Sequence, residues 1–301
     1  MTTKELKATA AAEQGQNARV ESFKKGWYKY SRNPLSMIGL IVVILVIVVA
    51  IFAMKIAPYP KDAGITVKLN EAFSAPSATH LAGTDEYGRD VFSRILIGTR
   101  SSLVIGLLVL AISVPVGVIL GLIAGYYKGT IVDLLIMRIT ELFMSIPPLI
   151  LAMVVCTMFS NGYMFAAIGI AVAWWPWYTR MTYNMVTSLS NELFIVYTKL
   201  SGVKMLKIII SEMLPNITSA IITKMSLDMG SIILTASSMS FVGLGVQPPE
   251  PSLGAMVSDG IAYLPEFWWL TLMPALMVVF IVLGFNLLGD GLTDVLSVEE
   301  K

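Results

Sequence analysis

The chain has 301 residues, of which 56% are hydrophobic and only 14% are charged. Soluble domains usually carry about 25% charged residues, so this composition excludes a water-soluble globule and indicates that a lipid bilayer is the solvent. The net charge of +1 argues against a nucleic-acid partner, and a single cysteine (Cys156) and a single histidine (His80) exclude a disulfide framework and multi-histidine sites within this chain.

Residues 1–34 are predicted to form a cytoplasmic tail. Residues 1 to about 20 are rich in Ala, Gln, Lys and Glu, a composition typical of disorder. Residues 21–31 combine four aromatic side chains with lysines, which predicts a short interfacial helix in the headgroup layer. Asn33-Pro34 then begins the first span, because proline is tolerated in the first turn of a helix.

Charge-free apolar runs predict about six transmembrane helices, since a spanning helix needs about 20 apolar residues. The first run starts too far from the N-terminus, and is too long, for a cleaved signal peptide. The run 142–179 is too long for one crossing, and its turn residues 160–162 divide it into two helices. The sequence therefore predicts an all-α membrane protein with spans at about 35–57, 102–126, 136–160, 163–181, 217–243 and 267–288.

Lys and Arg residues predict that both termini are cytoplasmic. Seven of them lie in the N-terminal tail, whereas the turn 160–162 and the stretch 243–268 contain none. The outer segment, residues 58–101, holds five, but a long folded segment weighs less in this comparison. The C-terminal tail, residues 290–301, is then also cytoplasmic. The remaining basic residues of the inner connections are Lys128, Arg138, Arg180, Lys199, Lys204 and Lys207.

Charged residues inside the predicted spans are few. Lys224 and Asp228 are four residues apart in the fifth span, so they lie on one face and can pair. Two interpretations remain: an ion pair that faces the helix bundle, or part of a translocation or gating contact. No chain of Asp, Glu or His crosses the mid-bilayer, which argues against proton coupling within this chain. There is also no G-x-x-x-x-G-K-[ST] loop, so any ATP must be bound by a separate chain.

The connection between the fourth and fifth spans, residues 182–216, is a candidate docking loop. Its second half predicts a short helix, a break at Gly202, an amphipathic helix and then Leu214-Pro215-Asn216. Gly202 permits a turn that a residue with a Cβ atom resists. The sequence thus predicts a helical hairpin at the membrane face, although an interfacial amphipathic helix would give the same pattern.

This loop resembles that of the binding-protein-dependent ABC importer permeases, which carries E-A-A, three residues, G, and a proline thirteen residues later. Gly202 and Pro215 keep that spacing, while Val196-Tyr197-Thr198 stands where Glu-Ala-Ala is usual. The resemblance implies a coupling helix that docks on an ATPase subunit. The residues that it assigns to this docking loop are Val196, Tyr197, Thr198, Lys199, Gly202, Lys204 and Leu206.

A second motif lies in the outer segment, from His80 to Leu103. It resembles the G-T-D-x-x-G-R-D-x-x-S-R segment of the second permease subunit in the dipeptide/oligopeptide/nickel family. The alternating Asp and Arg residues can order the segment through local ion pairs, or they can contact substrate or a binding protein. The motif residues are Gly83, Thr84, Asp85, Gly88, Arg89, Asp90 and Arg94.

Three more segments match the same family in order. Residues 124–149 resemble A-G-Y...G...D...M-R...P-x-L, and Pro147-Pro148 predict a kink or a late helix start there. Residues 240–254 resemble F-L-G-L-G-x-x-P-P-x-P-S-W-G, with Leu253 in place of Trp. Residues 286–294 resemble N-L-L-G-D-x-L-R-D, with Thr293 in place of Arg. The resemblance therefore covers roughly residues 33–294.

The resemblance implies a type I ABC importer permease in a prokaryotic cell membrane. A sister permease would complete the pore, two ABC ATPase subunits would bind ATP, and an extracytoplasmic solute-binding protein would deliver substrate. This chain would be surrounded by lipid, hold no cofactor or metal, and perform no catalysis. Di- or oligopeptides are the expected substrates because they dominate the family, with nickel or other metal chelates and glutathione as alternatives. A secondary carrier or channel is the alternative of a different class, and a membrane enzyme would need a catalytic cluster that the spans lack.

Overall fold

Long apolar helices form the body of the protein. The computed structural model describes residues 24, 26–159 and 162–296. Within them there is no β-strand, only an isolated bridge between Thr84 and Asp90. The predicted all-α membrane fold is thereby confirmed. Four helices are long and apolar enough to cross a membrane: α2 (Pro34–Ile56), α3 (Val91–Tyr126), the continuous helix Met205–Phe241 that contains α9 (Leu214–Phe241), and α11 (Trp269–Leu296).

The predicted third span, residues 136–160, is not one straight helix. The structure has α4 (Ile131–Met144) and α5 (Pro148–Thr157), which meet at an angle of 91°. Pro147 has extended backbone angles, because the ring of Pro148 disfavours the helical region for the residue before it. Pro148 then starts α5, where its missing N–H is not needed. The sequence predicts a kink or a late helix start at the paired prolines, and the structure has a nearly right-angled break there.

The fourth span corresponds to α6 (Tyr163–Leu189), which has 27 residues. It is long enough to cross a membrane, but Trp, Tyr, Pro and Arg residues make it less apolar than the four helices above. Counting α4 and α5 as one broken unit, α6 brings the helical units of membrane length to six in the described part of the chain. The predicted turn at 160–162 lies largely outside the described residues.

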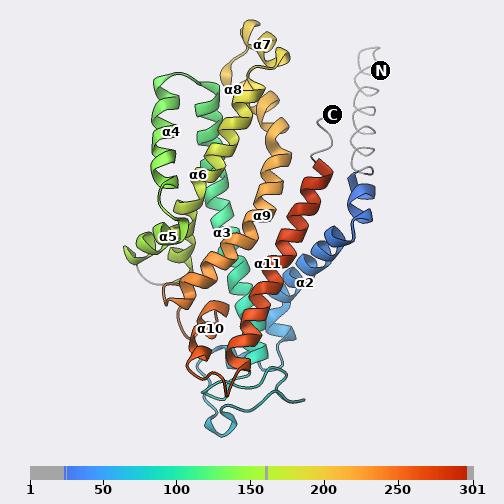
Figure 1. The fold of residues 1–301 in the computed structure, drawn as a ribbon, viewed down its shortest axis with the longest axis vertical. Helices are drawn as coiled ribbons and strands as arrows, with labels where there is room; N and C mark the ends of the chain where they lie inside the picture. Colours follow the sequence, from blue (N-terminus) through green and yellow to red (C-terminus); the bar gives the residue numbers. More distant parts are fainter. Residues whose placement is uncertain (1–23, 25, 160–161, 297–301) are drawn as a thin grey trace, which may run out of the picture.

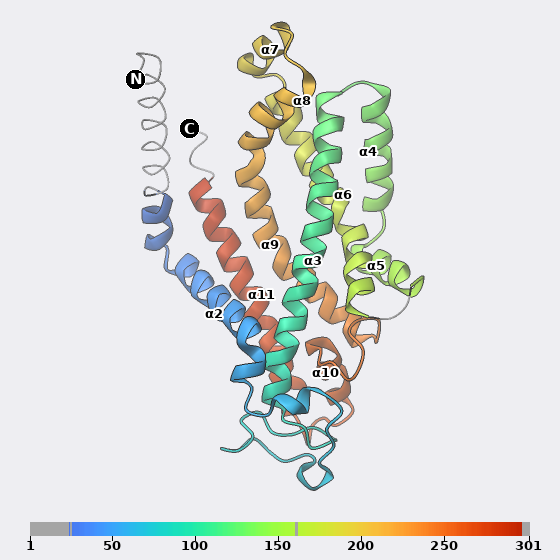
Figure 2. The same cartoon turned by 180° about the vertical axis from the view of Figure 1, so that it is seen from behind.

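The helical units run alternately in opposite directions (Figures 1 and 2). One end of the molecule carries α7 (Leu193–Leu200) and α8 (Met205–Ile208), together with the start of α2 and the end of α11. The opposite end carries α10 (Leu253–Ile261) and the segment between α2 and α3. The side chain of Asn33 donates a hydrogen bond to Asp294 at 3.2 Å, so the two ends of the described chain meet on one side, as the distribution of basic residues predicts.

Helix boundaries differ from the predicted ones on both sides of the membrane. The outer segment was expected to end at 101, but its last eleven residues already belong to α3. Only its remainder is irregular, with short 3-10 helices at Pro60–Ala63 and Leu69–Glu71. The expected tail and interfacial helix are described only in part: residues 26–32 are helical, while residues 1–23 and 297–301 lie outside the described residues.

Small residues allow α3 and α6 to pack closely along most of their length. Gly117, Gly121 and Gly125 repeat every four residues on the face of α3 that contacts α6. A Cβ atom added at any of them would lie 2.5 to 2.8 Å from atoms of α6, too close for the helices to keep their separation. Such small-residue stripes drive helix association in membranes, where apolar burial gives little advantage. The α3–α6 pair is thus a close-packed scaffold for the connection that follows α6.

Candidate functional site

The connection after α6 forms a helical hairpin at the end of the molecule (Figure 1). Helix α7 ends at Leu200, and the N–H of the next residue, Ser201, donates to the Tyr197 carbonyl at 2.9 Å. Gly202 follows with a φ of +73°, the left-handed conformation that commonly terminates helices. Its N–H donates to the Lys199 carbonyl at 3.1 Å. Gly202 therefore makes the reversal that leads into α8.

Two isoleucines anchor this hairpin to the scaffold. Ile195 of α7 and Ile208 of α8 are completely buried, and they share a core with Val118 of α3 and Val186 of α6. The outward side is also apolar but is exposed. We call this surface the hairpin tip: Leu193 is 70% exposed, Tyr197 65%, Leu200 78% and Leu206 67%. Large exposed apolar patches mark interaction sites, so the hairpin tip has the character of a docking surface.

The structure divides the predicted docking residues into two groups. Val196, Tyr197, Lys204 and Leu206 are exposed. Thr198 and Lys199 are only partly exposed. The Thr198 hydroxyl donates to the Phe194 carbonyl at 2.7 Å, and the Lys199 ammonium lies 4.7 Å from the centre of the Tyr126 ring of α3. The Thr198 bond lies within α7 itself, whereas the Lys199 contact links α7 to α3.

Leu193, Phe194 and Leu200 were missed as candidate docking residues, although all three are exposed. The outward face of this helix of eight residues is fixed by the burial of Ile195. Ile195 is buried in the core formed with α3 and α6, so the loop sequence alone does not show which face of α7 points outward.

Helix α8 continues into the membrane without a break. A π-helical segment, Ile209–Met213, joins it to α9, so Met205–Phe241 is one helix of 37 residues. Pro215 lies in the first turn of α9 and does not end the helix. The wider π-turn just before it relieves the backbone where the proline lacks an N–H. The hairpin is therefore continuous with a membrane-crossing helix.

The outer motif forms one connected network around Asp90. This buried carboxylate caps α3 by accepting from the Ser93 N–H at 2.7 Å, and it also contacts the His80 ring at 2.8 Å. The Asp90 N–H donates to Asp62 at 3.0 Å. Asp62 in turn pairs with Lys68 at 3.1 Å. The network thus ties the start of α3 to the irregular outer segment.

Asp85 is the second centre of the outer motif. It accepts from the Arg89 N–H at 2.9 Å and from the Arg89 guanidinium at 2.7 Å, and its carboxylate lies 3.6 Å from Arg94. Gly83 and Gly88 both have positive φ, and Thr84 makes the bridge to Asp90. All seven predicted residues of the motif are therefore brought together, with partners inside the chain.

A small recess with charged side chains of both signs borders this network. Asp259 of α10 lies near Glu86, Arg89 and Arg94. Burial and the nearby Glu86 carboxylate raise the pKa of Asp259, whereas the guanidinium groups act in the opposite direction. Tyr263 donates to Glu86, and this hydrogen bond raises the pKa of Tyr263 to about 12. The recess connects the outer motif to the segment between α9 and α11.

Gly88→Ala is expected to destabilise the outer segment. The new Cβ atom would lie 2.0 Å from the Lys68 carbonyl oxygen, at a φ of +73°. Overpacking and a left-handed backbone together cost about 3 kcal/mol, which should lower the melting temperature of the detergent-solubilised protein. Gly64→Ala is the matched control in the same segment, because its Cβ would have no neighbour nearer than 3.5 Å. Equal melting temperatures for the two variants would contradict the importance of this contact.

Lys224 and Asp228 form the ion pair that their spacing predicts, with 3.0 Å between the ammonium and one carboxylate oxygen. The ammonium also lies 5.6 Å from the ring centre of Tyr178, so the pair links α9 to α6. The other oxygen of Asp228 and the hydroxyls of Tyr178, Thr182 and Thr223 are buried and have no hydrogen-bond partner among the described residues. A polar cluster with unused hydrogen-bonding capacity therefore lies between the two helices that flank the hairpin.

Comparison with known protein families gives two matches. Residues 117–298 match the model of the binding-protein-dependent transport system inner membrane component. Residues 22–76 match the model of the N-terminal transmembrane domain of oligopeptide transport permease C. The two matches together cover the hairpin, the polar cluster and the first membrane helix, while the outer motif lies between them.

Two proteins with similar sequences are named as dipeptide transport permeases. The dipeptide transport system permease protein DppC of Alkalihalophilus pseudofirmus is 35% identical over 95% of this chain and 93% of that protein. DppC of Haemophilus influenzae is 34% identical over 91% of this chain and 94% of that protein.

Among solved structures, a chain of the MetNI methionine ABC transporter, in inward-facing conformations, matches with a TM-score of 0.51. It is 19% identical and covers 68% of this chain and 95% of that chain. This likeness supports an ABC importer permease fold. The chain is a multi-pass protein of the prokaryotic cell membrane and a transport component rather than an enzyme, and it belongs to the family of binding-protein-dependent transport system inner membrane components.

Proposed function

We propose that this chain is the transmembrane permease subunit of an ATP-driven, binding-protein-dependent importer of di- or oligopeptides. The observation that carries the proposal is the α7–α8 hairpin. It exposes an apolar tip, is anchored by Ile195 and Ile208, and continues directly into α9. Large exposed apolar patches mark contacts with another protein or with a membrane, and separate ATPase subunits are the partner in this proposal.

Energy then reaches the membrane through the hairpin. ATP binding closes the two ATPase subunits, which carries the docked hairpin with them. Because α8 and α9 are continuous, a displacement of the hairpin moves α9 relative to α6. A sister permease supplies the other half of the pathway, and a solute-binding protein delivers substrate from outside. Hydrolysis returns the ATPases, and with them the hairpin, to the starting position.

Peptides are the proposed substrates because the similar proteins are named as dipeptide transport permeases. Reconstituted with its partner subunits, the importer should take up a labelled dipeptide into proteoliposomes only when ATP and the binding protein are present. An unlabelled tripeptide should compete. Dominant competition by a nickel chelate or by glutathione, with no effect of peptides, would overturn the peptide assignment.

Docking at the hairpin tip can be tested by cysteine labelling. The native Cys156 is fully buried, so a Tyr197→Cys variant should react with a maleimide mainly at the new position. ATPase subunits should protect that cysteine. A Lys128→Cys variant places a control cysteine at an exposed position in the α3–α4 turn, outside the hairpin. Equal labelling of Tyr197→Cys with and without ATPase subunits would refute docking at the tip.

A further inference from the structure

A cavity at the outer side of the molecule carries three charged side chains that no part of the described protein neutralises. Its volume is about 620 Å³, and Lys61, Arg100 and Glu250 line it. Lys61 comes from the outer segment, Arg100 from α3 and Glu250 from the segment after α9. All three side chains are exposed. We call this the outer cavity.

The lack of partners distinguishes these residues from their neighbours. Asp62, next to Lys61, pairs with Lys68 at 3.1 Å, and Arg94, earlier on α3, lies 3.6 Å from Asp85. By contrast, Lys61, Arg100 and Glu250 make no ion pair and no side-chain hydrogen bond with any residue that the structure describes. The three charged groups are therefore free to bind a charged ligand, because no pairing within the described protein has to be broken first.

The arrangement offers both signs of charge in one cavity. A guanidinium binds a carboxylate through two parallel hydrogen bonds, and a lysine ammonium adds a second positive charge. A glutamate carboxylate accepts hydrogen bonds from an ammonium group. The cavity volume falls within the range of about 300–1,000 Å³ that is typical of small-molecule sites. Apolar side chains such as Met54, Ile97 and Val104 complete the wall and impose no charge requirement.

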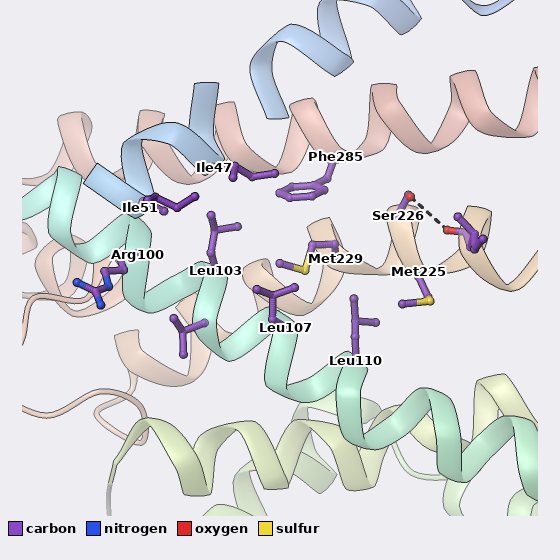
Figure 3. A pocket seen from close by; sticks show the side chains of 13 residues that line it. Ile47, Ile51, Arg100, Leu103, Leu107, Leu110, Met225, Ser226, Met229 and Phe285 are labelled. Carbon is purple, nitrogen blue, oxygen red and sulfur yellow. Dashed lines mark hydrogen bonds between the residues drawn. The ribbon is translucent and has the colours of Figure 1, made fainter. Parts of the chain in front are cut away.

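Arg100 also lines a second cavity, which extends along α3 toward the middle of the molecule and is open on one side, where Ile51 and Leu107 are exposed. This inner cavity has a volume of about 610 Å³ and lies between α2, α3, α9 and α11. Figure 3 shows Arg100 at one end of it, with Leu103, Leu107 and Leu110 following along α3. Among the residues that the structure describes, Arg100 is the only charged one that lines it. The guanidinium therefore lies where the outer cavity, which holds three charged side chains, borders an inner cavity that is lined almost entirely by apolar side chains.

We propose that the outer cavity receives short zwitterionic peptides, with Arg100 and Lys61 binding the terminal carboxylate and Glu250 binding the terminal ammonium. This proposal rests on the proposed peptide import and adds a recognition site within the permease itself. Because only the two termini are bound through charge, peptides with different side chains are accepted equally. A permease with such a site checks for both free termini after the binding protein has released its cargo.

The test uses the complete importer in proteoliposomes and compares variants with the wild type for each peptide separately. The binding protein's own selectivity cancels in the ratio of variant to wild-type uptake. For a dipeptide with free termini, Arg100→Gln should lower uptake about tenfold, the effect of one lost charge-assisted contact. For the same dipeptide with an amidated C-terminus, the ratio should be close to one. Glu250→Gln should likewise lower uptake of the dipeptide with free termini. Its ratio should be close to one for an N-acetylated dipeptide, which lacks the terminal ammonium.

Lys55→Gln is the matched control, because it removes an exposed cation at the end of α2 that does not line the cavity. It should leave all ratios at one. Equal losses for free and amidated peptides in Arg100→Gln would overturn the proposal. So would a loss that disappears when anionic lipid is omitted from the vesicles, since Arg100 would then bind a lipid phosphate. If the wild type imports no peptide at all, the proposed function fails; if it does and the ratios do not differ, only the recognition site fails.

Discussion

Gly202→Val is expected to abolish most ATP-driven uptake while the ATPase subunits continue to hydrolyse ATP. The φ of +73° at this position costs a β-branched residue about 2 kcal/mol or more, so the turn between α7 and α8 should change its course. No atom lies within 4 Å of the added Cβ, so the change acts through the backbone alone and not through a clash. Uptake into proteoliposomes should fall at least about tenfold, measured alongside phosphate release.

The chain provides a matched control for this variant. Gly129 lies in the α3–α4 turn, has a φ of +82°, and also has no atom within 4 Å of an added Cβ. Gly129→Val should therefore carry the same backbone strain without reaching the hairpin. Gly202→Asn should recover much of the uptake, because asparagine tolerates the left-handed region. Unchanged uptake in Gly202→Val, or an equal loss in Gly129→Val, would remove the coupling role from Gly202.

Lys224→Met is expected to destabilise the protein by about 3–5 kcal/mol, because it leaves the Asp228 carboxylate buried without its cation. Asp228 is only 9% exposed, and one of its oxygens already lacks a partner among the described residues. The double variant Lys224→Met/Asp228→Leu should regain most of the stability, since no uncompensated charge remains. Thermal unfolding of the detergent-solubilised protein measures both effects.

Lys199→Met is the control for the lost contact with an aromatic ring. Lys199 lies over Tyr126 much as Lys224 lies over Tyr178, but it has no carboxylate partner in the described part of the chain. The Lys199→Met variant should lose no more than about 1 kcal/mol of stability.

Uptake by the double variant Lys224→Met/Asp228→Leu then decides between the two interpretations of the ion pair. Normal uptake means that the pair only links α6 to α9, and a stable but inactive protein means that it takes part in translocation or gating.

The sequence predicts the membrane helices well because the absence of charge over a long run is a local property. It also predicts a disturbance at Pro147-Pro148, but not the angle of 91°, which depends on how α5 packs against α6. The outer motif shows a similar limit. Its turns can be read from Gly83 and Gly88, whereas the contact between Asp90 and Asp62 joins residues 28 positions apart.

The candidate sites divide in the same way. The spacing of Gly202 and Pro215 indicates the hairpin, but the outward face of α7 is set by the burial of Ile195 against other helices. The outer cavity is the extreme case, because Arg100 and Glu250 line it from positions far apart in the chain. Because the two residues are far apart in the sequence, no local motif contains both, and each one alone resembles an ordinary surface charge.

The uninterrupted helix from Met205 to Phe241 acts as a lever. Its 37 residues span about 55 Å, which exceeds the thickness of the hydrocarbon core. A tilt of about 5° at the hairpin would move the far end by about 5 Å, close to the rise of one helical turn. That far end adjoins the segment that carries Glu250. In the proposed importer, a small angular change at the docked hairpin would therefore be felt at the outer face, and an added hinge at the π-turn Ile209–Met213 would disconnect the two ends.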